Sequence, residues 1–165
     1  MQLLVAIHPD YLPASEIAKL PAEVMERAGG MRNVFLIDFV GLRKWQIPGL
    51  PAGRISHVGK SRGPANEFYP YKNNFKKALD KVSSKLGKGE KIDVTFFGGA
   101  ARNCFEGICE PALSVISERF KGRLASAKTY LPWVYGSKYR PPNRKAAPNW
   151  EVLHKRHSRR RGPLP

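Results

Sequence analysis

The residues best suited to chemistry follow an apolar run in the middle of the chain. Residues 92–97 (IDVTFF) have the composition of a buried strand, and two glycines and two alanines separate them from Arg102, Asn103 and Cys104. A cysteine at the start of a helix lies near free backbone N–H groups and the positive end of the helix dipole, which lower a thiol's pKa and can stabilise an oxyanion. The pattern predicts that Cys104 is either a nucleophile or a retained cysteine without a catalytic role.

Three further polar residues follow other apolar segments. His8 and Asp10 come after residues 3–7, and Lys60 comes after residues 54–58. His8 is either a loop histidine or a substitute general base, and Asp10 is either a turn residue or a displaced proton acceptor. Lys60 is either a surface or phosphate-contacting lysine or a catalytic group. Because functional residues gather at the carboxyl ends of parallel strands, these side chains could converge with Cys104.

Apolar runs that alternate with amphipathic segments predict the elements that position these residues. They favour an α/β fold, a three-layer sandwich with a central, mostly parallel sheet covered on both faces. Pro111 suits the first turn of a helix. The predicted strands are residues 3–7, 34–40, 54–58, 92–97 and 124–131, and the predicted helices are residues 15–28, 74–86 and 110–120.

Composition limits the class of protein. The 165 residues, 42% of them hydrophobic, suffice for one core domain, and no apolar run approaches the roughly 18 residues of a membrane span. The first residues lack the basic region and cleavage site of a signal peptide. Cys104 and Cys109 match neither a disulfide framework nor a metal motif. We therefore expect an intracellular, cytoplasmic protein with no membrane partner, metal or cofactor.

The net charge of +16 is concentrated at one end of the chain. Residues 136–165 carry half of it, with Glu151 as their one acidic residue, and the aromatic residues and prolines there suggest an extended arm. We divide the chain into a domain at 1–131 and a basic arm at 132–165, and we expect RNA or DNA as the partner, with an acidic protein as the weaker alternative. The predicted nucleic-acid-binding residues are Lys138, Arg140, Arg144, Lys145, Lys155, Arg156, Arg159, Arg160 and Arg161.

Three segments also carry a family resemblance through their order and spacing. They are LLVAIHPDY at 3–11, VGK at 58–60 followed by EFY at 67–69, and GAARNC at 99–104 followed by PAL at 111–113. Together they resemble the isochorismatase-like cysteine hydrolases, which include the nicotinamidases, over roughly residues 2–131. Members of this family often form oligomers, so the resemblance allows a homo-oligomer.

The resemblance implies roles for particular residues. Cys104 would attack an amide carbon with the help of Lys60, the amides of Ala100 and Cys104 would face the oxyanion, and the bond between Gly99 and Ala100 would be cis. The family's general base is an aspartate in the first strand, but alanine occupies that position, Ala6, in this chain. The family's metal-binding D-x-H pattern is also absent after residue 38.

These observations lead to two hypotheses about function. The first is a catalytically degenerate isochorismatase-like domain, a pseudoenzyme, that serves as a nucleic-acid-associated structural component of a ribosome-like or phage particle. The alternative is an active amidohydrolase that uses Cys104 and Lys60 on a small amide, with Asp10 or His8 as the displaced base.

Overall fold

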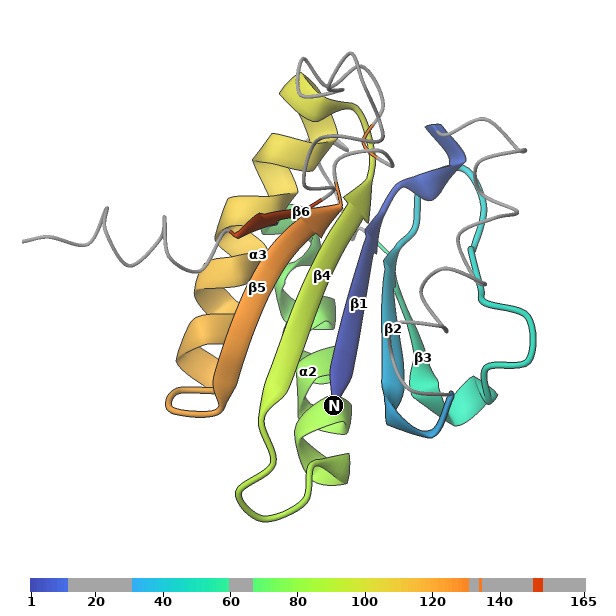
Figure 1. Cartoon of the computed structure of the whole chain (residues 1–165). Coiled ribbons are helices and arrows are strands. Elements are labelled where there is room, and N and C mark those ends of the chain that lie inside the picture. The colour runs from blue at the N-terminus through green and yellow to red at the C-terminus, as the bar shows by residue number, and fades with distance from the viewer. Residues whose placement is uncertain (12–30, 60–66, 131–133, 135–149, 153–165) are drawn as a thin grey trace, which may run out of the picture.

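The computed structural model describes residues 1–11, 31–59, 67–130, 134 and 150–152, and it shows an α/β fold (Figure 1). The sheet has the order β3-β2-β1-β4-β5-β6, in which β1 to β5 are parallel and β6 is antiparallel to β5. The predicted class with its mostly parallel central sheet is confirmed. The strands are β1 (Gln2–Ile7), β2 (Val34–Phe39), β3 (Ile55–Val58), β4 (Ile92–Gly98), β5 (Leu124–Tyr130) and β6 (Trp150–Val152).

The order of the strands creates a switch point between β1 and β4. From β1 the chain adds β2 and β3 on one side, and it then crosses to the other side to form β4 and β5. Loops that leave the carboxyl ends of neighbouring strands diverge at such a point, and a crevice for ligands commonly forms between them. The loops that follow β1 and β4 carry His8, Asp10 and Cys104, so these residues lie at the place where a site is expected.

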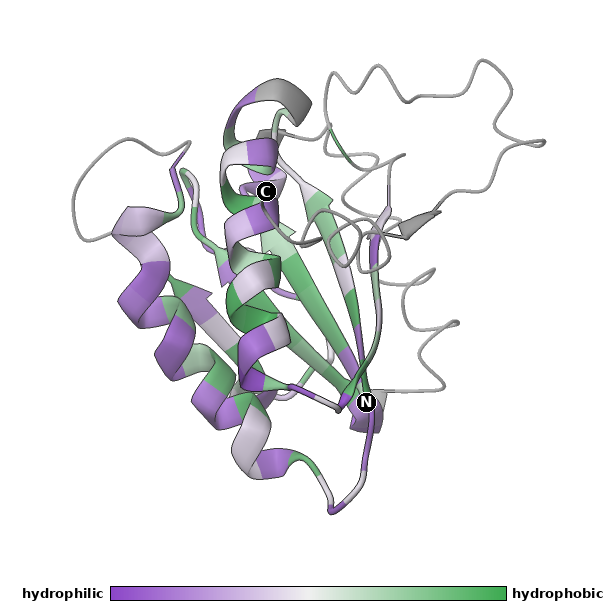
Figure 2. Cartoon of the chain, turned by 90° about the vertical axis from the view of Figure 1, so that its left-hand side faces the viewer, coloured by the Kyte–Doolittle hydropathy of each residue, from purple (hydrophilic) through white to green (hydrophobic). Residues whose placement is uncertain are grey.

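Two helices, α2 (Lys72–Lys85) and α3 (Glu106–Arg119), cover one face of the sheet (Figures 1 and 2). The buried side chains of α2 recur with helical periodicity and pack in the same core cluster as Leu3, Val5 and Ile7 of β1. Figure 2 shows the largely hydrophobic strands beneath the helices, whose outward sides are mostly hydrophilic. The buried residues of α2 are Phe75, Ala78, Leu79 and Val82.

In the described part of the chain, the opposite face of the sheet is covered by residues 41–50, which follow β2. Ile47 and Leu50 are buried there against Leu4 and Leu36. The sequence predicted a further helix at residues 15–28, which lie outside the described residues. Short helical turns connect the elements: η1 (Pro9–Tyr11), η2 (Met31–Asn33), η3 (Ala52–Arg54), η4 (Tyr69–Tyr71) and the π-helical turn η5 (Ala101–Phe105).

The five predicted parallel strands agree with β1 to β5 to within one residue at each end. The prediction for the third helix was wrong at its start, because α3 begins at Glu106 and Pro111 lies inside it rather than in its first turn. Proline removes one intrahelical hydrogen bond, to the carbonyl four residues earlier. The carbonyl left without this donor belongs to Gly107, which is only partly buried, so a water molecule can donate to it instead.

The arm predicted from residue 132 contacts the domain at two described places. Val134 is buried in the core on the helical face, and β6 pairs with β5, with Trp150 opposite Tyr130 and Val152 opposite Lys128. The strand β6 was not predicted, because three residues between prolines and basic residues carry no periodic signal.

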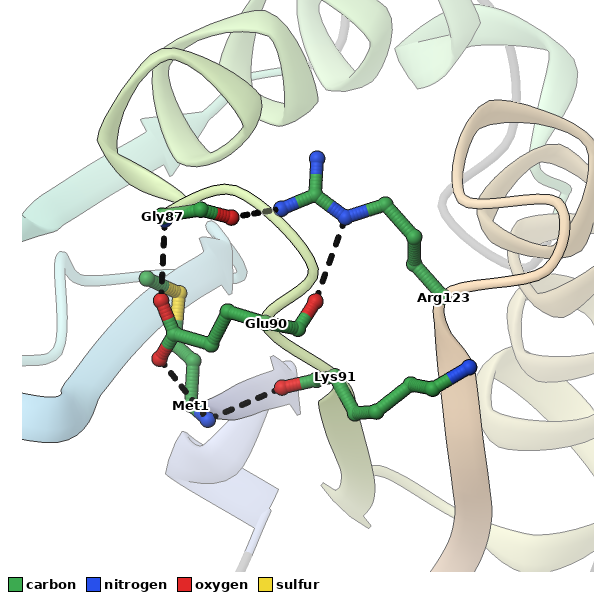
Figure 3. Close-up of polar contacts among 5 residues, drawn as sticks. All are labelled: Met1, Gly87, Glu90, Lys91 and Arg123. Carbon is green, nitrogen blue, oxygen red and sulfur yellow. Dashed lines mark hydrogen bonds and ion pairs between the residues drawn. The ribbon is translucent and has the colours of Figure 1, made fainter.

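A group of polar contacts joins neighbouring strands at the amino edge of the sheet, far from the candidate site (Figure 3). The Met1 ammonium donates to the Lys91 carbonyl at 3.0 Å and lies 3.2 Å from the Glu90 carboxylate. The Arg123 guanidinium donates to the carbonyls of Gly87 and Glu90, at 2.6 and 3.1 Å. The Gly87 N–H and the terminal ammonium lower the pKa of Glu90. These contacts join the amino ends of β1, β4 and β5.

The close approach of β1 and β4 yields the first prediction. Gly98 has φ +86°, and an added Cβ would lie 2.5 Å from the Ile7 carbonyl oxygen, whereas a Cβ at Gly53 would meet nothing within 4 Å. Gly98→Ala should therefore lower the free energy of unfolding by about 2–4 kcal/mol, from backbone strain and a backbone clash. Urea unfolding of both variants measures this, and equal stabilities of Gly98→Ala and Gly53→Ala would contradict it.

Candidate functional site

The candidate nucleophile lies in the turn that connects β4 to α3. Gly98 and Gly99 both have positive φ, +86° and +65°, and η5 follows them, so that Cys104 lies two residues before the start of α3. An added Cβ at Gly99 would lie 3.1 Å from the Cys104 sulfur and 3.2 Å from the Ile7 carbonyl oxygen. Because both positions lack a Cβ, the backbone of this turn can lie close to the Cys104 sulfur and to the carboxyl end of β1.

The environment of Cys104 keeps the thiol protonated. Only 3% of the residue is exposed, and it belongs to the core cluster on the helical face. Burial raises the thiol's pKa, the nearby N–H groups offset this only in part, and the negative charge of Asp10 raises it further. The expectation that the helix start would lower this pKa was wrong, because desolvation outweighs the backbone N–H groups.

The expected oxyanion site also differs from its prediction. The Ala100 N–H donates to the Cys104 sulfur at 3.2 Å, so the amide that was expected to face an oxyanion is engaged with the thiol. The expected cis bond between Gly99 and Ala100 is absent, since every described peptide bond is trans.

His8 follows β1 with an unusual backbone and a buried ring. It has φ +42°, the one positive value at a described residue other than glycine, and it is 1% exposed. Its Nε2 atom forms a 3.0 Å hydrogen bond with the hydroxyl of Tyr71, the last residue of η4 before α2 begins. The backbone N–H of His8 donates to the Phe39 carbonyl. The ring is therefore directed to the helical face, where it joins β1 to α2.

Asp10 is directed to the loop after β2. Its Oδ2 atom accepts the N–H of Leu42 at 2.8 Å, while its Oδ1 atom is buried without a hydrogen-bond partner. The Cys104 sulfur accepts a hydrogen bond from the Ala100 N–H. Asp10 affects the thiol through its negative charge, which raises the pKa of Cys104, and not through a hydrogen bond between the two described side chains.

Other predicted site residues fall in different places. Lys60 and the nine basic residues of the arm lie outside the described residues. Ala6, at the position of the family's aspartate, is fully buried on the other face of the sheet, between Asp38 of β2 and Phe97 of β4. The structure therefore brings Cys104, His8 and Asp10 to one edge of the sheet, and none of the described residues forms a hydrogen bond with the thiol as a base.

Sequence reasoning missed a polar pair next to this edge. Asp38 is fully buried, and its Oδ2 atom lies 2.9 Å from both His57 Nδ1 and the N–H of Trp45. Burial raises the pKa of Asp38, which the hydrogen bonds from Trp45 and His57 offset in part. The available signal was a single carboxylate within an apolar strand, since such a group needs polar partners when it is buried.

Asp38 and His57 lie opposite each other in the register of β2 and β3. The described residues contain no cluster of three or more His, Cys, Asp or Glu side chains arranged to hold a metal ion. This pair therefore joins two strands and the loop after β2.

A groove of about 580 Å³ lies elsewhere, between the start of α2 and the outer side of α3. Its rim combines the exposed ring of Tyr69 with Lys72 and Lys76, and also with Glu67 and Glu118. The balanced charge of these groups favours neither an anionic nor a cationic ligand.

The chain matches no protein-family model, and neither a curated protein nor a solved structure is significantly similar to it. Among the described residues, α2 and α3 are too short and too polar to cross a bilayer, and no other helix there does so.

The environment of Cys104 predicts slow alkylation. At pH 7 iodoacetamide should modify Cys104 in the native protein at least about tenfold more slowly than in the urea-unfolded chain, because burial limits access and disfavours the thiolate. Mass spectrometry of the Cys104 and Cys109 peptides measures both sites in one sample. Cys109, which is also buried with a raised pKa, is the internal control. Faster alkylation of native than of unfolded Cys104 would contradict the prediction.

The environment of Asp38 predicts a particular pH dependence. Its pKa is raised from 3.8, so the native chain retains a proton that the unfolded chain has already lost. The contribution of this group to stability is therefore present below pH 3.8 and is lost as the pH rises through the native pKa. As the pH rises from about 4 through the native pKa of Asp38, the unsubstituted protein should lose stability relative to Asp38→Asn, whose side chain does not titrate.

Urea unfolding across this pH range measures the difference. Asp80→Asn is the matched control, because Asp80 is exposed and pairs with Arg119 at the surface. A stability difference between Asp38→Asn and the unsubstituted protein that is constant with pH, or that changes in the opposite direction, would show that Asp38 does not titrate as described.

Proposed function

We propose that this protein is a catalytically inactive relative of the isochorismatase-like cysteine hydrolases that binds nucleic acid as a structural component of a nucleoprotein assembly. In this proposal the α/β domain is a rigid scaffold, and the basic residues after position 136 contact phosphates. Such contacts hold a protein on a nucleic acid without reading its sequence. The protein would act in the cytoplasm or within the particle itself.

The observation that carries the proposal is the distribution of charge. Residues 136–165 hold nine lysines and arginines and one glutamate, and they supply half of a net charge of +16. Phosphate contacts by such residues release counterions from the nucleic acid, and this release drives association. The aromatic residues among them, which include Tyr139, suit stacking on bases.

The state of the thiol argues against the hydrolase alternative. An amidohydrolase needs a thiolate and a proton acceptor within hydrogen-bond reach. Cys104 is buried with a raised pKa, and the position of the family's base holds the buried Ala6. The position of Cys104 between β4 and α3 agrees with the family resemblance, whereas its environment supports a domain that retains the loop without the reaction.

The pairing of β6 with β5 supports a role for the arm in binding. Val152 pairs with Lys128, so the chain is tied to the sheet between the basic residues at 138–145 and those at 155–161. A phosphate-binding segment that is fixed at an internal point loses less conformational entropy on binding than a free one.

Neutralising the end of the arm tests the proposal. A full-length variant that carries Gln at positions 155, 156, 159, 160 and 161 should bind single-stranded or duplex oligonucleotides more weakly. Its slope of log K against log salt should be shallower by about 3.5–4.5, since each of the five lost phosphate contacts contributes roughly 0.7–0.9 to the slope. Fluorescence anisotropy across a salt series measures both quantities.

The matched control removes the same number of charges from α2. It replaces five lysines with Gln, and these lysines are exposed on a helix that packs on the sheet through its other side. Equal losses in the two variants would mean that net charge alone governs binding, and absence of binding by the unsubstituted protein would overturn the proposal. The control positions are Lys72, Lys76, Lys77, Lys81 and Lys85.

A further inference from the structure

The loop after β2 carries an exposed apolar and basic tip at the carboxyl edge of the sheet. Leu42 is 92% exposed, and Arg43 and Lys44 beside it are also exposed and form no hydrogen bond or ion pair within the described part of the chain. Single exposed leucines are common on protein surfaces. What distinguishes this tip is that two aspartate side chains, the half-buried Asp10 and the buried Asp38, hold the backbone on both sides of it.

The first anchor is the carboxylate of Asp10. Its Oδ2 atom accepts the Leu42 N–H at 2.8 Å, and the carboxyl group lies directly against the Cα of Gly41. A Cβ at position 41 would overlap with this carboxyl group, so the contact requires glycine there. Asp10, which lies in η1 just after β1, thus fixes the start of the tip.

The second anchor is the buried carboxylate of Asp38. Its Oδ2 atom accepts the Trp45 N–H at 2.9 Å and is held from the other side by His57 of β3, also at 2.9 Å. The Trp45 ring packs edge-on against Phe97, with 5.6 Å between the ring centroids. The backbone is therefore fixed at positions 42 and 45, and the three exposed side chains project from a short, rigid segment between these points.

We propose that Leu42, Arg43 and Lys44 form a contact for the phosphodiester backbone of a nucleic acid. Arg43 and Lys44 would contact phosphates, and Leu42 would pack on a sugar or base beside them, as apolar side chains of groove-binding proteins pack against bases next to cations that contact the backbone. Because the backbone is already fixed, the contact costs little ordering on binding. One leucine supplies too little apolar area for a membrane anchor, which favours nucleic acid.

This inference rests on the proposed function and adds a second contact, on the domain itself. Two groups of cations, one on the loop tip and one on the arm, would contact the same strand at separate phosphates. The affinity of the whole chain then exceeds that of either group, because the second contact forms within the complex.

The test measures the affinity of full-length Arg43→Gln/Lys44→Gln for RNA and DNA oligonucleotides across a salt series. We expect affinity to fall at least fivefold near 0.1 M salt, and the slope of log K against log salt to become shallower by roughly 1.4–1.8, for two lost phosphate contacts. The matched control, Lys81→Gln/Lys85→Gln, removes two exposed charges from the far end of α2 and should lose clearly less affinity.

Two further variants separate the shape of the tip from its charge. Leu42→Ser keeps both cations and, since the side chain is exposed, should leave folding intact while affinity falls about two- to fivefold. Gly41→Ala keeps all three tip residues but displaces the Asp10 anchor, so affinity should fall although no charge is lost. Circular dichroism and the unfolding midpoint verify the fold of each variant.

The outcomes distinguish the two proposals. If neutralising the arm weakens binding while Arg43→Gln/Lys44→Gln behaves like the α2 control, the loop contact is overturned and the proposed function stands. If the unsubstituted protein binds neither RNA nor DNA, both are overturned. A loss confined to RNA or to DNA supports the contact and identifies the nucleic acid.

Discussion

The close approach of β1 and β4 is the constraint on which the rest of the carboxyl edge depends. Gly98 has no Cβ, so the end of β4 can lie against the Ile7 carbonyl, and the turn that follows brings the Cys104 sulfur over Gly99. The same approach places the switch point of the sheet between two loops that carry polar side chains. A larger residue at position 98 would separate the strands and move every residue of the candidate site.

Tight packing at this point also explains why the pKa of the Cys104 thiol is raised. An activated cysteine needs solvent or a cation near its sulfur, whereas Cys104 is enclosed by the helical-face core and lies near the negative charge of Asp10. His8 and Asp10 turn away from it, toward Tyr71 and Leu42. The polar groups at the carboxyl edge thus join elements of the scaffold.

Two aspartate side chains, the buried Asp38 and the half-buried Asp10, hold the loop after β2 in place. Asp38 is costly to bury, and its two donors come from separate elements, the loop at Trp45 and the strand at His57. If either donor moved away, a carboxylate would remain buried without its partner. This coupling fixes the loop after β2 relative to β3, and the Asp10 contact fixes it relative to β1.

Much of the fold could be predicted from the sequence because its signals are local. Apolar runs located all five parallel strands, and helical periodicity located α2 to within two residues. The start of α3 was missed because Pro111 resembles a first-turn residue, although tertiary packing carries the helix back to Glu106. The strand β6 was missed because a short edge strand is defined by its partner, β5, and not by its own side chains.

The sequence by itself determined the α/β class, the order of the polar loops and the uneven charge, since composition and periodicity do not depend on distant contacts. Only the tertiary structure decided the state of the site. The raised pKa of Cys104 follows from desolvation by residues that are distant in sequence, and the pairing of Asp38 with His57 follows from the register of two strands. A pKa depends on what surrounds a group in space, and a sequence does not display those surroundings.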